Sequence, residues 1–269
     1  MRYASEQAYR FHQESFGESA EQVVTVPGVM SLLGEHCEPL GGRVLKAALP
    51  WSVSVAVSKR ADNSLRFISD AFRDPKKSSL SNLKFKREDR WANYLKGVLS
   101  AVHRRGFVAK GLNFSVTSDL PYGRGLGSST AMVLAATIAV RNAFDYPMPD
   151  FELIRCGIEA EHLATSHSGL VSEYHAAMNA RPSTALLYDG QSRDTDCISW
   201  DDSELALLMI DSQVPVSDVW EELPERVQSC RRCLDFASRE LGIRDVHLLE
   251  QTQIWEGFDG ISEGERRRF

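Results

Sequence analysis

The sequence lacks the features that would place the protein in a membrane or on a nucleic acid. No apolar run is long enough to cross a bilayer, and the first residues, 1–7, are polar and do not resemble a signal peptide. The basic residues form no long cluster, and the net charge at pH 7 is −6, which disfavours a general nucleic-acid-binding role. We therefore expect a cytoplasmic protein with no membrane partner and no nucleic-acid partner.

Cysteine is also sparse, with five residues in a chain of 269. An odd number scattered through a chain of this size and setting does not indicate a disulfide framework. Cys230 and Cys233 form a CxxC pair, but no second pair and no nearby histidine complete a zinc set, so we assign no metal or redox role to them. The chain can bury a sizeable core, in one large or two modest domains.

What the sequence does contain is a glycine-rich stretch, Pro121–Thr130, between two apolar segments. Residues 112–117 alternate apolar and polar side chains like a half-buried strand, and residues 131–140 are almost all apolar, as in a buried helix. Glycine allows a positive φ and a close approach of a ligand, and the first turn of a helix offers unpaired N–H groups. Serine and threonine suit the helix N-cap. The pattern predicts an anion-binding loop; the alternative is a glycine-rich turn that binds nothing.

The loop is neither a Walker A sequence nor a dinucleotide fingerprint. It resembles the PxGxGLxSSA loop of the GHMP kinases, the family of galactokinase, homoserine kinase, mevalonate kinase and phosphomevalonate kinase, and only Thr130 interrupts the match, before Ala131. The resemblance implies that the protein binds ATP. It places the nucleotide's phosphates on Gly123, Gly125, Leu126, Gly127, Ser128, Ser129 and Thr130.

A second motif lies at residues 27–42, where an apolar segment ends in a polar, glycine-bounded turn. So dense a group of hydrogen-bonding side chains suits a polyhydroxylated ligand or an ion, although a hairpin with solvated acids would also explain the glycines. The stretch resembles the first galactokinase motif, PGRxNLxGEHTDYNGG, which covers the sugar. Val29 stands where that family has an arginine. The resemblance implies substrate contacts at Glu35, His36, Glu38 and Gly41, and at Gly169 farther along the chain, and Gly42 also matches the motif.

Two further segments resemble nucleotide-binding parts of the family. Residues 150–163 form a helical pattern with an Ala-Glu-His sequence, whose glutamate the family directs toward the nucleotide's magnesium. Mg²⁺ prefers one or two carboxylates together with phosphate oxygens, so the resemblance implies Glu161 and the hydroxyl of Ser129 as metal ligands. Trp91 begins a segment similar to WxNYxKGV, which places it near the adenine, although a core position would explain it equally well.

The proton acceptor has two candidates in residues 168–174, where galactokinases carry CGxMDQ with a catalytic aspartate. If Gly169 is matched to the family's glycine beside the substrate, Ser172 falls at the base position. If the spacing to Glu161 and to the strand at 186–189 is kept without gaps, Glu173 falls there. We prefer Glu173 because it retains a carboxylate.

The resemblance implies an α+β fold of the GHMP kinase type. We expect a domain like ribosomal protein S5 domain 2 over residues 1–200 and a truncated ferredoxin-like domain over residues 201–269. Expected elements include helices at 5–20 and 221–242, a strand at 23–26 leading into Pro27, two strands around Pro50, a hairpin within 59–89, and a strand at 205–210.

The leading functional hypothesis is a galactokinase-like, ATP-dependent kinase of carbohydrate metabolism that phosphorylates a monosaccharide hydroxyl. The second is a catalytically impaired protein that senses a sugar or nucleotide, because Val29 replaces the family's arginine. A homoserine- or mevalonate-type substrate ranks third. The sequence predicts neither the sugar nor the oligomeric state.

Overall fold

The computed structural model describes residues 2–72, 74–166, 169–179, 181, 183–199, 207–214, 222–244, 248 and 260–268. The chain forms two compact units, and each is built from three separate segments of the sequence. The first contains residues 1–30, 48–122 and 126–181, and the second contains residues 31–47, 123–125 and 182–269. The domain boundary that we expect near residue 200 stays a prediction.

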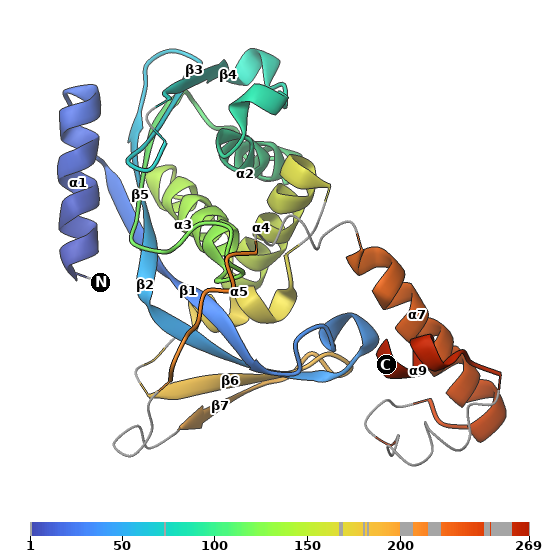
Figure 1. Ribbon diagram of the computed structural model, residues 1–269. Helices are drawn as coiled ribbons and strands as arrows, with labels where there is room; N and C mark the ends of the chain where they lie inside the picture. Colours follow the sequence, from blue (N-terminus) through green and yellow to red (C-terminus); the bar gives the residue numbers. More distant parts are fainter. Residues whose placement is uncertain are drawn as a thin grey trace. The chain divides into compact units, whose positions relative to one another are not determined.

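A mixed sheet forms the frame of the first unit (Figure 1). The second half of β2 runs antiparallel to β5, with Val57 opposite Phe114, and β5 runs parallel to β3, which pairs with β4. The strand β1 also pairs with β2. The bounds of these strands are Gln22–Leu33 (β1), Arg43–Lys59 (β2), Ser64–Ser69 (β3), Lys76–Ser79 (β4) and Leu112–Ser118 (β5).

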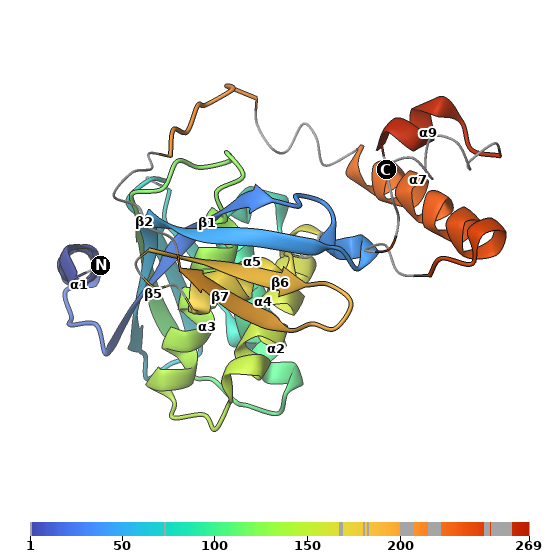
Figure 2. The ribbon, with the colours of Figure 1, turned by 90° about the horizontal axis from the view of Figure 1, so that it is seen from below.

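Helices cover both faces of this sheet (Figures 1 and 2). The helices α2, α3 and α4 pack against one another on one face of the sheet, and α1 lies across β5 on the other face. The central helix α3 is rich in alanine and other apolar residues, and most of it is buried. The helix bounds are Arg2–Phe16 (α1), Ala92–Arg104 (α2), Ser128–Ala143 (α3), Asp150–Thr165 (α4) and Val171–Met178 (α5).

The alternation of apolar and polar residues in β2 and β5 has a different cause from the one that the sequence suggests. Val55 and Val57 face the helical layer, but Ser54 and Ser58, on the other face, are buried as well. The helix α1 covers them with hydrogen-bonding side chains, since His12 bonds both Ser58 and Ser115 at 2.9 Å. The pattern thus marks a strand covered on both faces, one apolar and one polar, and the expectation of a half-buried strand is wrong.

The second unit contains a small antiparallel sheet and a helical segment. Residues 43–47 of β2 pair with β6, and β6 pairs with β7. In the helical segment α7 continues into a π-helical turn at Ala237–Leu241, ends at Gly242 with a φ of 69°, and packs against α9. The helix expected at 221–242 is confirmed over residues 223–241. The remaining bounds are Thr184–Asp189 (β6), Thr195–Ser199 (β7), Leu223–Phe236 (α7) and Glu263–Arg268 (α9).

Three expectations for strands are wrong. The strand at 23–26 continues through Pro27 to Leu33. Residues 44–57 form one strand, because Pro50 falls between the segments that pair with β6 and with β5 and costs neither ladder a hydrogen bond. In the strand expected at 205–210, residues 205 and 206 lie outside the described residues, and residues 207–210 have no strand structure. No helix in the described ranges is long and apolar enough to span a membrane.

Candidate functional site

The glycine-rich loop has the backbone that its sequence predicts. Gly123, Gly125 and Gly127 have φ values of 68°, 71° and 66°, a region that side chains disfavour. Gly127, not a serine, is the N-cap of α3, and no side chain caps the helix. Within the described part of the chain, no backbone hydrogen bond is donated by the N–H groups of residues 123–129 outside the helix. These amides remain available to an anion at a helix N-terminus.

The loop is attached to β1 at two neighbouring positions. The N–H of Val29 donates to the carbonyl of Leu126 at 3.0 Å. A Cβ on Gly28 would lie 2.7 Å from the same carbonyl oxygen and 2.5 Å from the Leu120 side chain. Glycine at position 28 therefore lets the loop cross over the strand, and the Pro27-Gly28 pair does not mark the end of a strand. Val29 itself is buried, with 2% of its surface exposed.

Glu161 projects from α4 into the interior of the first unit, beside the start of α3. It is 4% exposed, and its Oε2 atom has no hydrogen-bond partner among the described residues. A Cβ on Gly169 would lie 1.9 Å from this oxygen, so glycine at that position makes room for the carboxylate. A buried acceptor without a partner is costly, which makes Glu161 a candidate ligand for a bound group.

Burial also changes the acidity of Glu161. Desolvation raises the pKa of its carboxyl to about 7, the Ser129 hydroxyl opposes this change, and the negative charge of Glu173 adds to it. A cation bound beside this carboxyl would oppose the rise in its pKa, because a nearby positive charge favours the ionised form.

The two candidates for the proton acceptor lie next to each other on α5 but in different surroundings. Ser172 is fully buried, at 0% exposed. Glu173 is half-buried, and its Oε2 accepts a hydrogen bond of 3.1 Å from the Thr130 hydroxyl. The same hydroxyl lies 3.5 Å from Oε1 of Glu161. The structure thus gathers Ser129, Thr130, Glu161, Gly169 and Glu173 at the start of α3.

Trp91, which we expect near the adenine, is only 8% exposed, and its indole N–H has no partner in the described part of the chain. Its ring stacks on that of Phe72, with 6.2 Å between the ring centroids. The ring of Phe72 in turn lies 5.3 Å, centroid to centroid, from that of Tyr122, the residue just before the first loop glycine. Phe72 and Tyr122 are 36% and 40% exposed. They extend the aromatic surface toward the loop, and the sequence motifs did not identify them.

The polar turn of the second unit follows β1. Glu35 and His36 are exposed and Glu38 is half-buried. His36 has a φ of 70°, which is uncommon outside glycine and is typical of functional turns. Gly41 has a φ of 81° and ends the short 3₁₀ helix Glu38–Leu40. Gly42 is buried and accepts a hydrogen bond of 3.1 Å from the N–H of Gly190.

A buried cation lies behind this turn. Lys46, on β2, is 1% exposed; its Nζ donates to the Ser31 hydroxyl at 2.7 Å and lies 3.8 Å from Oε2 of Glu35. The sequence motifs did not identify this residue, although a lone lysine among the apolar residues of a strand is a signal that could have found it. Arg124, in the glycine-rich loop, pairs with Asp211 at 3.0 Å, a contact that the sequence does not predict.

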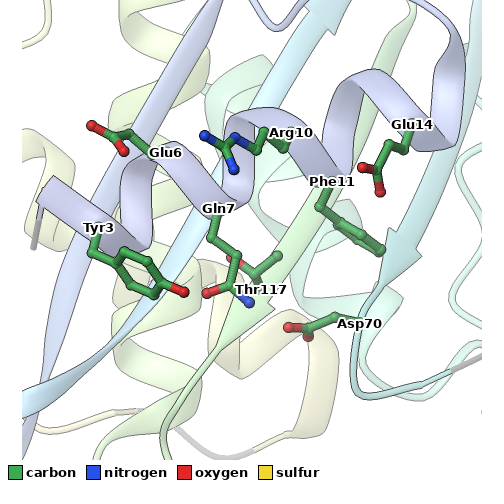
Figure 3. A pocket seen from close by; sticks show the side chains of 8 residues that line it. All are labelled: Tyr3, Glu6, Gln7, Arg10, Phe11, Glu14, Asp70 and Thr117. Atoms are coloured by element: carbon green, nitrogen blue, oxygen red, sulfur yellow. The ribbon is translucent and has the colours of Figure 1, made fainter.

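A separate cavity of about 300 Å³ lies under α1 (Figure 3). It is on the face of the sheet opposite to α3, so it does not belong to the site at the loop. Its lining mixes charged, polar and aromatic side chains: Tyr3, Glu6, Gln7, Arg10, Phe11, Glu14, Asp70 and Thr117.

Two family models match the chain at these places. The model described as "GHMP kinases N terminal domain" matches residues 93–177, which contain the glycine-rich loop, Glu161 and Glu173. The model described as "Galactokinase galactose-binding signature" matches residues 10–59, which contain the polar turn and Lys46. In these two segments the chain is similar to the GHMP kinase superfamily, and to its galactokinase branch in particular.

Curated galactokinases are similar to this chain over most of its length. The galactokinase of Ligilactobacillus salivarius is 27% identical over 94% of the chain and 66% of its own length. That of Streptococcus thermophilus is 28% identical over 93% of the chain and 64% of its own length. The chain thus spans slightly less than two thirds of these relatives.

Solved structures confirm the GHMP kinase fold. The Lactococcus lactis galactokinase complexed with galactose matches with a TM-score of 0.80 at 20% identity, over 98% of this chain and 69% of the other. The mevalonate kinase of Methanococcus jannaschii matches with a TM-score of 0.57 at 15% identity, over 83% and 73%. The roles of the individual site residues stay predictions.

Proposed function

We propose that the protein is an ATP-dependent sugar kinase that transfers the γ-phosphoryl group to a hydroxyl of galactose or a related monosaccharide. The observation that carries this proposal is the Glu161 carboxylate, which is buried with an unpartnered oxygen beside the start of α3. A carboxylate in that place is useful only when a cation joins it, and the neighbouring open amides suit the phosphates that accompany such a cation.

The nucleotide would be held mainly by the backbone. The unpaired N–H groups of residues 123–129 and the positive end of α3 favour the β- and γ-phosphates. The adenine would lie near Trp91, against the exposed rings of Phe72 and Tyr122. A solved GHMP relative, the phosphomevalonate kinase of Streptococcus pneumoniae, contains the ATP analogue AMPPNP.

The residues fit a magnesium ion. Glu161 offers an oxygen that no described residue bonds, and Ser129 offers a hydroxyl that acts on the same carboxyl. These two groups would hold Mg²⁺, which keeps several waters and takes its other ligands from phosphate oxygens. When bound, it neutralises charge on the transferring phosphoryl group.

The sugar would lie at the polar turn. Glu35, His36 and Glu38 can accept or exchange hydrogen bonds with vicinal hydroxyls. Two findings support a hexose as the substrate. A galactose-binding signature matches residues 10–59, and the similar Lactococcus lactis galactokinase forms a complex with galactose.

The chemistry asks little of the protein beyond positioning and charge neutralisation. The bond from the γ-phosphorus to the oxygen that bridges to the β-phosphate breaks, and a bond from the sugar oxygen to phosphorus forms. The hydroxyl proton leaves to a base. Glu173 remains our candidate for this base, because it keeps a carboxylate beside the loop, whereas Ser172 is fully buried and cannot serve as a carboxylate.

One observation favours the alternative, a protein that binds sugar and nucleotide without turning them over. Val29 fills the family's arginine position with a buried apolar side chain, so this strand supplies no cation at that point. Loss of such a cation lowers the rate of transfer more than it lowers binding.

The test is an ADP-release screen of the full chain with magnesium-ATP across hexoses and pentoses, combined with calorimetric titration of ADP. We expect turnover with galactose or a close relative, and loss of turnover in Glu161→Gln. Nucleotide and sugar binding without turnover would support the sensor instead. Absence of nucleotide binding would refute both.

A further inference from the structure

A single hydroxyl joins the two carboxylates at the start of α3. Thr130 Oγ1 lies 3.1 Å from Oε2 of Glu173 and 3.5 Å from Oε1 of Glu161. The three side chains come from three different helices, α3, α4 and α5. Because a hydroxyl has one proton, it donates to one carboxylate at a time, and the shorter distance assigns the bond to Glu173 in this structure.

The Thr130 hydroxyl matters for the energy of this site because the groups around it are buried. Thr130 is 1% exposed and Glu161 is 4% exposed, so water cannot readily replace the hydroxyl. Two carboxylates held near each other in such surroundings repel, and the arrangement is costly unless a donor or a cation stands between them. Thr130 supplies the donor, and the unpartnered Oε2 of Glu161 remains for the cation.

The hydroxyl is particular to this chain when its loop is set beside the PxGxGLxSSA motif, where alanine follows the two serines. Alanine could not bridge two carboxylates. In this chain the Thr130 hydroxyl donates to the carboxylate of Glu173.

We propose that Thr130 is a positioning residue that holds Glu173 beside Glu161, so that both carboxylates contribute to the affinity for the nucleotide's divalent cation. The proposal rests on the proposed function, because it takes the cation from there. When the cation occupies Glu161, the Thr130 hydroxyl has only Glu173 left to bond, and Glu173 is fixed next to the phosphates. Thr130 acts through Glu173 and is not itself a catalytic residue.

The test is a double-mutant cycle that needs no sugar. The affinity of Mn²⁺ for the full chain in the presence of ADP is measured by electron paramagnetic resonance of free Mn²⁺, for wild type, Thr130→Val, Glu173→Gln and the double variant. We expect Glu173→Gln and Thr130→Val each to weaken Mn²⁺ binding by about tenfold, because each removes a charge or a charge-assisted hydrogen bond. In the Glu173→Gln background, Thr130→Val should have no further effect.

Two controls separate positioning from packing. Thr130→Ser keeps the hydroxyl and should bind Mn²⁺ within about twofold of wild type, because the hydrogen bond is retained. Thr137→Val removes another fully buried hydroxyl of α3, one that donates to the carbonyl of Val133 at 2.8 Å, and should leave Mn²⁺ binding unchanged. Thermal unfolding of each variant checks that it is folded.

The outcomes distinguish this proposal from the proposed function. Additive effects of the two substitutions, a failure of Thr130→Ser to restore binding, or the absence of Mn²⁺ binding by wild type would overturn the role of Thr130. A non-additive cycle in a protein that turns over no sugar would support the role of Thr130 and refute the kinase activity alone. Turnover of sugar with an additive cycle would do the reverse.

Discussion

Val29 and Leu126 are joined by a backbone hydrogen bond of 3.0 Å, from the N–H of Val29 to the carbonyl of Leu126. This bond links the strand β1 to the glycine-rich loop, although almost 100 residues separate the two segments. The bond uses only the main chain of residue 29, so any side chain at that position leaves the loop attached to β1. Valine in place of the family's arginine therefore leaves this backbone link between strand and loop intact.

The first prediction concerns Gly28, which lets the loop approach the strand. In Gly28→Ala, the new Cβ would lie 2.7 Å from the Leu126 carbonyl oxygen, so the loop must move. We expect a loss of about 1–3 kcal/mol in the free energy of unfolding, the usual cost of overpacking. ADP affinity should fall about tenfold, because the loop amides lose their arrangement. Urea denaturation and calorimetric titration measure the two effects.

Gly264→Ala is the matched control for this experiment, because its Cβ would meet no atom within 4 Å and the residue lies in the helix α9. It should leave ADP affinity unchanged. Wild-type affinity in Gly28→Ala would contradict the close approach of strand and loop.

Local chemistry explains which parts of the site could be predicted. The positive φ values at Gly123, Gly125 and Gly127 follow from the glycine spacing itself, whereas Glu161 was selected by resemblance to the family's Ala-Glu-His motif and its role as a metal ligand stays a prediction. Both signals lie within a few consecutive residues. They need no knowledge of distant segments.

The parts that the sequence did not predict depend on contacts between distant segments. The contact between Lys46 and Glu35 forms because β2 places the lysine behind the turn that carries Glu35. The sequence did not predict the burial of the polar face of β2 and β5, because the helix that covers it, α1, lies about 40 residues or more away in the sequence. Likewise, the sequence marks Thr130 only as an interruption of the motif, and its hydrogen bond to Glu173 depends on the position of α5.

A second prediction follows from the buried ammonium of Lys46. Lys46→Met removes the charge near Glu35 and the donor to Ser31, while it keeps the length of the side chain. We expect the KM for the sugar to rise about tenfold, because Glu35 loses the cation that orients it, with a smaller change in the KM for ATP. Steady-state kinetics with each substrate varied in turn separates these effects.

Arg43→Met serves as the control for Lys46→Met. Arg43 also lies on β2, but its ion pair with Asp189 is solvent-exposed and contributes little. If both variants raised the sugar KM equally, a general loss of positive charge would explain the result, and the specific role of Lys46 would be refuted.

A third prediction concerns Gly169, whose missing side chain makes room for Glu161. In Gly169→Ala the Cβ would lie 1.9 Å from Oε2 of Glu161, so the carboxylate must rotate away. We expect the Mg²⁺ concentration for half-maximal ADP binding to rise by about tenfold or more, because the cation loses its buried oxygen ligand. Fluorescence titration of a labelled ADP measures it. Unchanged Mg²⁺ dependence in a folded Gly169→Ala protein would show that this oxygen does not face the cation.

The last prediction concerns His12, which is buried between Ser58 and Ser115 and near the carboxylate of Glu18. Burial lowers the pKa of His12 from 6.5 to about 4, against the opposing charge of Glu18. Between these two values the unfolded chain binds more protons than the folded chain, so the stability that a neutral His12 contributes is complete above pH 6.5 and is lost as the pH falls toward 4. Allowing for solvent screening, we expect His12 to account for a loss of about 1–2 kcal/mol in unfolding free energy between pH 7 and pH 5.

Urea denaturation of wild type and His12→Gln at both pH values measures this difference, which should shrink in the variant because glutamine does not titrate. His103→Gln, at an exposed position of α2, should keep the wild-type pH dependence. If His12→Gln also kept it, protonation of His12 would not be coupled to the packing of α1 against the sheet.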